Sequence, residues 1–150
     1  MIRIEKEAWA VIVGHARGAY PDECCGAMLG AAPGGGGTCI SIAVPLKNAY
    51  HGSQKDRYEI RPEDLLAVDR QARGEGLELI GIYHSHPDCD AYFSVTDLKN
   101  SCPWYSFVVV SIREGRFDQA KSFRPNADQT VAEPEDLAYP DLEESACQRS

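Results

Sequence analysis

The chain has 150 residues, which fits one domain with a core large enough to be stable on its own. Hydrophobic residues make up 43% and charged residues 25%, which excludes an intrinsically disordered chain. The formal net charge of -8 disfavours nucleic acid and anionic membranes as partners, because the field of the protein would repel both.

The start of the chain and its cysteines indicate the compartment. No apolar stretch approaches the roughly 20 residues that a membrane-spanning helix needs. Glu5, Lys6 and Glu7 stand where a secretory signal would have its apolar core. We therefore expect a cytoplasmic protein whose six cysteines are reduced thiols. The sequence has no C-x-x-C pair, which disfavours a structural zinc knot or a redox pair.

Strands and one helix are predicted in the first 60 residues from the spacing of the apolar side chains. The segments are a strand over 2–4, an amphipathic helix over 9–20, strands over 26–30 and 38–45, and a short strand over 57–60. The glycine run 34–37 lacks the features of a phosphate-binding loop, so it is expected to form a hairpin turn. The polar stretch 47–56 fits an exposed loop, a kind of segment that often contacts substrate.

The next part of the chain begins with a helix. Pro62 followed by Glu63 and Asp64 suits a first helical turn, and the helix is expected to end at Gly74 or Gly76. The further elements are a buried strand over 77–83, a short helix ending near residue 100, and strands over 107–112 and 117–123.

The order of these elements predicts the fold class. One helix between each group of strands points to a three-layer α/β domain with a mixed sheet flanked by helices. From Pro125 onward the chain is acidic and broken by prolines. Residues 1–124 are therefore expected to form the domain, and residues 125–150 a loosely held tail.

Two histidines at the end of the buried strand 77–83 could share a metal ion. Residues i and i+2 of an extended chain point to the same side, and Pro87 is expected to stop the strand just after them. Asp97 lies thirteen residues after His84, in the first turn of the next helix, and its carboxylate can point back toward His84 and His86. Two imidazoles and one carboxylate suit Zn²⁺ and leave a fourth tetrahedral position for water, which indicates catalysis.

Each of these residues also has a simpler explanation. Ser94 and Asp97 fit the N-cap and N3 positions of any helix, and two histidines can be satisfied polar residues at a strand end. A chance match to H-x-H-P, six residues and S-x-x-D is on the order of 10⁻⁵ for a chain of this length. The combined pattern therefore favours the metal site.

The string HSHP-x6-S-x2-D, preceded by a glutamate near the end of the first helix, resembles the JAMM or MPN-plus metalloproteases, and specifically their short prokaryotic single-domain members. PDECCGAMLG, RYEIRPEDLL and LELIGIYHSHP are similar to recurrent segments of that group. The resemblance implies a cytidine-deaminase-like fold with one catalytic zinc ion held by His84, His86 and Asp97. It also implies that Glu23 is the general base toward the water on the zinc, and that Ser94 supplies a hydroxyl near the oxyanion.

Two local points stay open. From its residue type alone, Glu23 fits a solvated turn residue after Pro21, and Asp22 competes with it for the role of base. Many members of the family have prolines in the loop where this chain has 88–93, so a more mobile loop is expected here. Cys89 in that loop could be a fourth ligand, an inhibitory one or a free thiol.

The resemblance also implies the substrate. Members of the family cut amide or isopeptide bonds at the C-terminal glycine of ubiquitin-like proteins, and the short bacterial ones resemble enzymes acting on sulfur carriers. Such a tail could bind by strand addition beside an exposed sheet edge, with the loop 48–57, Tyr92 and Phe93 shaping the groove. A non-catalytic MPN interaction module and a less specific zinc peptidase are the alternatives. A deaminase and a zincin lack their signatures here.

Overall fold

The computed structural model describes residues 1–32 and 37–141. Within these ranges the chain forms one sheet in the order β7-β6-β5-β4-β2-β3-β1-β8, together with three helices. The strands are β1 (Ile2–Ile4), β2 (Cys25–Ala31), β3 (Thr38–Leu46), β4 (Glu78–Pro87), β5 (Ser106–Arg113), β6 (Arg116–Pro125), β7 (Ala132–Glu135) and β8 (Leu137–Ala138). The helices are α1 (Lys6–Ala19), α2 (Pro62–Gly74) and α3 (Val95–Lys99). Apart from Gly37, the hairpin turn expected at 34–37 lies outside the described residues.

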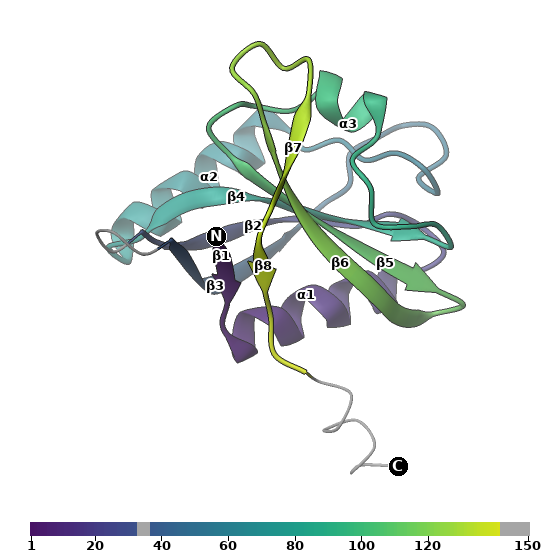
Figure 1. Ribbon diagram of the computed structural model, residues 1–150, viewed down its shortest axis with the longest axis horizontal. Coiled ribbons are helices and arrows are strands. Elements are labelled where there is room, and N and C mark those ends of the chain that lie inside the picture. Colours follow the sequence, from purple (N-terminus) through teal and green to yellow (C-terminus); the bar gives the residue numbers. More distant parts are fainter. Residues whose placement is uncertain (33–36, 142–150) are drawn as a thin grey trace.

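The helices cover both faces of the sheet (Figure 1). Trp9 and Ile12 of α1 pack in a core cluster with Tyr83 of β4, while Val68 and Ala72 of α2 pack against the opposite face. Strands β4 and β5 run parallel, and β2 pairs with β4 antiparallel. The expected three-layer domain with a mixed sheet is therefore confirmed.

Strand β4 continues farther than expected, and this places both histidines inside the sheet. The strand was expected over 77–83 with the histidines at its end and Pro87 as its stop, but its pairing with β5 includes Pro87, which lies opposite Ile112. Proline is tolerated at this position because β2 pairs with β4 only as far as His84, so no neighbouring strand needs an N–H from Pro87 on that side. Asp88 N then donates to Ile112 O at 2.7 Å.

The short strand expected over 57–60 is not present. Asn48 replaces the partner strand: its Nδ2 donates to Arg57 O at 3.0 Å, and its Oδ1 accepts from Glu59 N at 3.1 Å. One amide side chain thus satisfies main-chain groups that a neighbouring strand would otherwise bind. The segment remains an extended loop.

The tail expected to be loosely held contains a strap, residues 132–138, that pairs with both ends of the sheet. Its first half, β7, is antiparallel to β6, and its second half, β8, is parallel to β1. Between them, Asp136 O accepts from Ile2 N at 2.8 Å. Proline is tolerated in such edge strands, so Pro134 does not prevent the pairing. Strand pairing thus extends past the expected boundary at residue 124, and residues 142–150 lie outside the described ranges.

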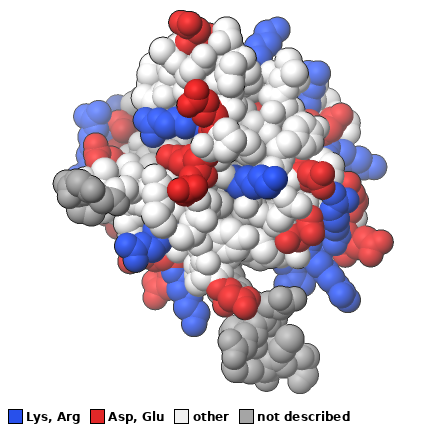
Figure 2. Space-filling view, viewed as in Figure 1, with Lys and Arg blue, Asp and Glu red and all other residues white. Residues whose placement is uncertain are grey.

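The surface carries charges of both signs. Figure 2 shows acidic and basic side chains interspersed on one face, and next to one another at the end of the β5–β6 hairpin at the lower right. The five cysteines within the described ranges are free thiols, as expected. Across those ranges, no helix combines the length and apolar character that crossing a membrane requires.

Candidate metal centre

The ligand atoms of His84, His86 and Asp97 converge in a buried cluster. His84 Nε2 lies 3.3 Å from His86 Nε2 and 3.2 Å from Asp97 Oδ2, and His86 Nε2 lies 3.5 Å from the same oxygen. The relative exposures of the three residues are 0%, 3% and 8%. The structure thus brings together the three residues predicted from sequence, and the group could hold a metal ion.

The outer hydrogen bond of His86 leaves its Nε2 available as a metal ligand. Its Nδ1 lies 2.9 Å from Asp90 O, and because a carbonyl oxygen only accepts, Nδ1 carries the proton. A neutral His86 then presents a bare Nε2 to the Asp97 carboxylate at 3.5 Å. Two facing acceptors repel each other unless a cation lies between them.

Asp97 is both a helix cap and a candidate ligand, so the two interpretations of the sequence hold together. Ser94 Oγ accepts from Asp97 N at 2.9 Å, and Ser94 N donates to Asp97 Oδ2 at 3.0 Å, which is a capping box. Burial alone would raise the pKa of Asp97. The neighbouring His84 and the hydrogen bond from Ser94 N outweigh this effect and hold the pKa far below its usual range.

His84 is held by stacking. Its ring lies 4.6 Å from the ring of Tyr58 at an interplanar angle of 26°. Its Nδ1 is buried and has no hydrogen-bond partner among the described residues. Burial lowers the pKa of His84, so the neutral form that binds metals is favoured. Sequence reasoning missed Tyr58, because no local pattern shows that this loop residue reaches the histidine.

Glu23 lies two residues before β2, where the register of that strand with β4 brings it beside the cluster. Cys25 is opposite His84, and Cys24 N donates to Ser85 Oγ at 2.8 Å. Continuing this antiparallel register places Glu23 next to His86. The side chain is 5% exposed, and its Oε1 has no hydrogen-bond partner among the described residues. A solvated turn residue is therefore the wrong interpretation of Glu23, whereas Asp22 is only half-buried.

The environment of Glu23 predicts a pH-dependent stability. Burial, followed by the charges of Asp97 and Asp56, raises its pKa from 4.5 to about 9. Between these values the folded metal-free protein keeps a proton that the unfolded chain has released, so stability falls as pH rises. From pH 5 to 7.5 the metal-free protein should lose about 3 kcal/mol of unfolding free energy relative to Glu23→Gln. Urea unfolding measures this, and a constant difference would contradict a buried, protonated Glu23.

Cys89 does not join the ligand group, which among the described residues comprises His84, His86 and Asp97. Burial, and then the charge of Glu23, raise the pKa of its thiol, which disfavours the thiolate that binds metals. Cys89 is a half-buried free thiol. Of the interpretations considered from sequence, this is the one that the structure favours.

A cavity of about 400 Å³ adjoins the cluster at Asp97. One wall is the loop expected to shape a groove, and the other follows α3; the lining includes Tyr50, Arg57, Tyr58, Thr96, Trp104 and Tyr105. Tyr92 and Phe93 do not line it. Tyr92 lies against the His86 ring at 4.9 Å, and Phe93 packs on Phe107 at 5.3 Å. The loop 48–57 thus contributes to the wall of this cavity, and which residues shape a substrate groove stays a prediction.

Comparisons with family models, curated proteins and solved structures agree on one protein family. Residues 5–125 match the family model of prokaryotic homologs of the JAB domain. The chain is 30% identical over 105 residues to a desampylase from Haloferax volcanii, covering 67% of this chain and 73% of the relative. It is 32% identical over 114 residues to a CysO-cysteine peptidase from Mycobacterium tuberculosis, covering 75% of each. The solution structure of a protein from Desulfitobacterium hafniense is similar, with a TM-score of 0.79, 25% identity and 94% of each chain covered. The chain therefore belongs to the prokaryotic homologs of the JAB domain, which confirms the resemblance noted in its sequence.

Proposed function

We propose that the protein is a zinc-dependent hydrolase of amide or isopeptide bonds at the C-terminal glycine of a ubiquitin-like or sulfur-carrier protein. The observation that carries the proposal is the buried group of three ligand atoms with Glu23 beside it. The relatives named desampylase and CysO-cysteine peptidase support this type of hydrolysis.

Zinc fits the ligand group in both chemistry and spacing. Two neutral imidazoles and a carboxylate are ligands that zinc prefers, and three protein ligands are typical of its catalytic sites. Ligands at about 2.0 to 2.1 Å from a tetrahedral zinc are separated from each other by roughly 3.3 to 3.4 Å. The separations in this protein are 3.2, 3.3 and 3.5 Å.

The residues of this chain would divide the work of amide hydrolysis. Zinc bound here would supply Lewis acidity and lower the pKa of water to about 7. The charge of a zinc ion nearby would favour the ionised form of Glu23, whose carboxylate would then accept the proton of the attacking water and pass it to the leaving amine. Ser94 Oγ already accepts from Asp97 N, which leaves its own O–H to donate to the developing oxyanion. One such donor is typically worth about 2.7 to 4 kcal/mol of transition-state stabilisation.

The carrier tail would enter through the cavity beside Asp97. A tail could not add beside β4 over residues 81–84, because β2 and β5 pair with that stretch on either side. A chain bound in this cavity would reach Asp97, the proposed metal ligand, between aromatic side chains. Apolar surface with a few polar groups is typical of pockets that bind an extended ligand.

Cleavage assays on defined carriers test the proposal. The substrates would be ubiquitin-like proteins ending in Gly-Gly joined to cysteine or to a lysine side chain, with an unrelated unfolded protein as a control. Zinc-loaded protein should release the adduct after the second glycine, and a chelator should stop the reaction. Equal cleavage of the unrelated protein would indicate a less specific peptidase. Failure of the wild-type protein to bind zinc would indicate a non-catalytic module.

A further inference from the structure

On the side of its ring away from the cluster, His86 makes a hydrogen bond, whereas the corresponding Nδ1 of His84 has no partner among the described residues. Its Nδ1 donates to Asp90 O at 2.9 Å, and the same carbonyl accepts from Tyr92 N at 3.0 Å. Such a bond fixes the tautomer of a metal-binding histidine and the direction of its other nitrogen. The position of the Asp90 carbonyl therefore determines where Nε2 of His86 points.

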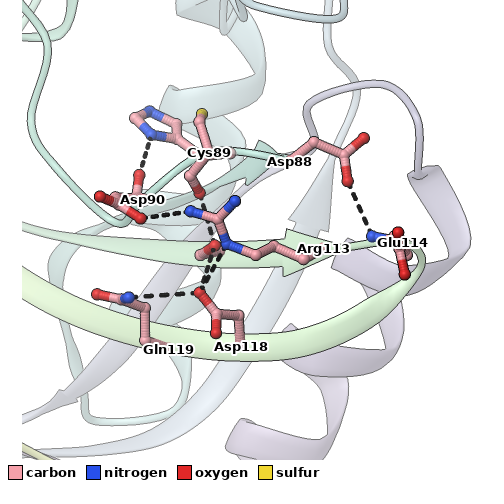
Figure 3. Close-up of polar contacts among 9 residues, drawn as sticks. Asp88, Cys89, Asp90, Arg113, Glu114, Asp118 and Gln119 are labelled. Carbon is pink, nitrogen blue, oxygen red and sulfur yellow. Dashed lines mark hydrogen bonds and ion pairs between the residues drawn. The ribbon is translucent and has the colours of Figure 1, made fainter.

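The side chain of Asp90 is held by Arg113 at the end of β5. Figure 3 shows the guanidinium group between two carboxylates, Asp90 in the loop after β4 and Asp118 on β6. Its Nη2 forms an ion pair with Asp90 Oδ1, and its Nε donates to Asp118 Oδ2 at 3.1 Å. The guanidinium thus connects the loop to the β5–β6 hairpin through two different nitrogen atoms.

The same hairpin fixes the two residues before Asp90. Ser111 Oγ donates to Cys89 O at 2.6 Å, and Glu114 N donates to Asp88 Oδ1 at 2.8 Å. Figure 3 shows the contact between Glu114 and Asp88. The loop that was expected to be mobile for lack of prolines is therefore attached to the hairpin residue by residue. Arg113 supplies the contact at Asp90, the residue whose carbonyl accepts the hydrogen bond from His86.

We propose that Arg113 is a positioning residue for the metal centre, acting on His86 through the main chain of Asp90. Without the contact between the guanidinium and the Asp90 carboxylate, Asp90 would lose its tie to the hairpin, and its carbonyl would no longer be held in place toward His86. This inference rests on the proposed metal site. It concerns zinc affinity and ligand geometry and assigns no contact between Arg113 and the substrate.

Zinc affinity of Arg113→Gln tests this role. Loss of an outer-sphere partner typically weakens metal binding by about 10- to 100-fold, and we expect about 10-fold because Arg113 acts one residue farther out. The ion pair is half exposed, with side-chain exposures of 45% and 70%, so it contributes little to overall stability. The metal-free variant should therefore melt near the wild-type temperature. Chelator competition measures the affinity, and the absorption of the Co²⁺ form reports a changed ligand geometry.

Arg116→Gln is the matched control, since Arg116 lies opposite Arg113 across the same hairpin and is exposed. It should bind zinc as the wild type does. Arg113→Lys keeps the charge but cannot reach both carboxylates in the same way, so partial recovery is expected. Asp90→Asn should reproduce the loss, and the double variant should be no weaker than either single one.

The failure of this inference can be distinguished from that of the proposed function. If wild-type protein binds zinc and Arg113→Gln has an affinity within twofold of the Arg116→Gln control, the positioning role is wrong. Additive losses in the double variant would also contradict it. If the wild type itself does not bind zinc, the proposed function fails first.

Discussion

Replacement of Glu23 with glutamine is expected to slow cleavage of a carrier by about 10²- to 10⁴-fold, the usual contribution of a general base. Glutamine has nearly the same shape but cannot accept the proton of the attacking water. Oε1 of Glu23 has no hydrogen-bond partner among the described residues, so the substitution breaks no contact at that atom. Zinc content should stay at the wild-type level, because the ligands are unchanged. Single-turnover rates on a Gly-Gly-cysteine carrier measure the effect.

Asp22→Asn provides the control for this variant. Asp22 is the neighbouring acid and is only half-buried, so its loss should leave the rate close to that of the wild type. If Asp22→Asn were the slow variant and Glu23→Gln the fast one, the base would be misassigned. Equal rates for all three proteins would remove both acids from the mechanism.

Asp97→Asn is expected to weaken zinc binding by more than about 100-fold. Loss of an outer-sphere group alone typically costs 10- to 100-fold, and here an anionic ligand is replaced by a neutral amide. The amide oxygen of asparagine can still accept from Ser94 N, so the cap of α3 is retained. The loss should therefore appear in metal affinity and activity, while the far-ultraviolet circular dichroism spectrum stays unchanged. Chelator competition and metal analysis after dialysis measure it.

Asp64→Asn is a suitable comparison for Asp97→Asn. Asp64 occupies the same position in the first turn of α2, where it forms an ion pair with Arg61 at 3.0 Å. Any general effect of neutralising an acid near a helix start should appear in both variants. Wild-type zinc affinity in Asp97→Asn would show that the carboxylate is not a ligand.

Much of the fold could be predicted because its elements follow local rules. Helices α1 and α2 present apolar residues at helical spacing, and Pro62 with two acids marks the start of α2. The ligand set was visible because the i, i+2 spacing of His84 and His86 and the cap position of Asp97 are local too. Each of these features needs only a few neighbouring residues to be recognised.

The features that escaped prediction depend on contacts between distant segments. The strap carries few apolar residues, and its strands form only because β6 and β1 offer unpaired edges. Tyr58 stacks on a histidine 26 residues away in the sequence. The burial of Glu23 follows from the register between β2 and β4, and its own residue type suggested a solvated position. Sequence periodicity contains no information on such pairings.

The strap, residues 132–138, covers the outer edges of two strands, β6 and β1, at once. Ile2 lies opposite Leu137, so this pairing closes a very long loop at a cost in chain entropy. A local opening that releases residues 132–138 uncovers the outer edges of β6 and β1 together. Free edges are templates for pairing with another molecule, and a released strap is complementary to the same two edges on a second copy. One short segment thus protects two edges of the sheet from pairing with another molecule.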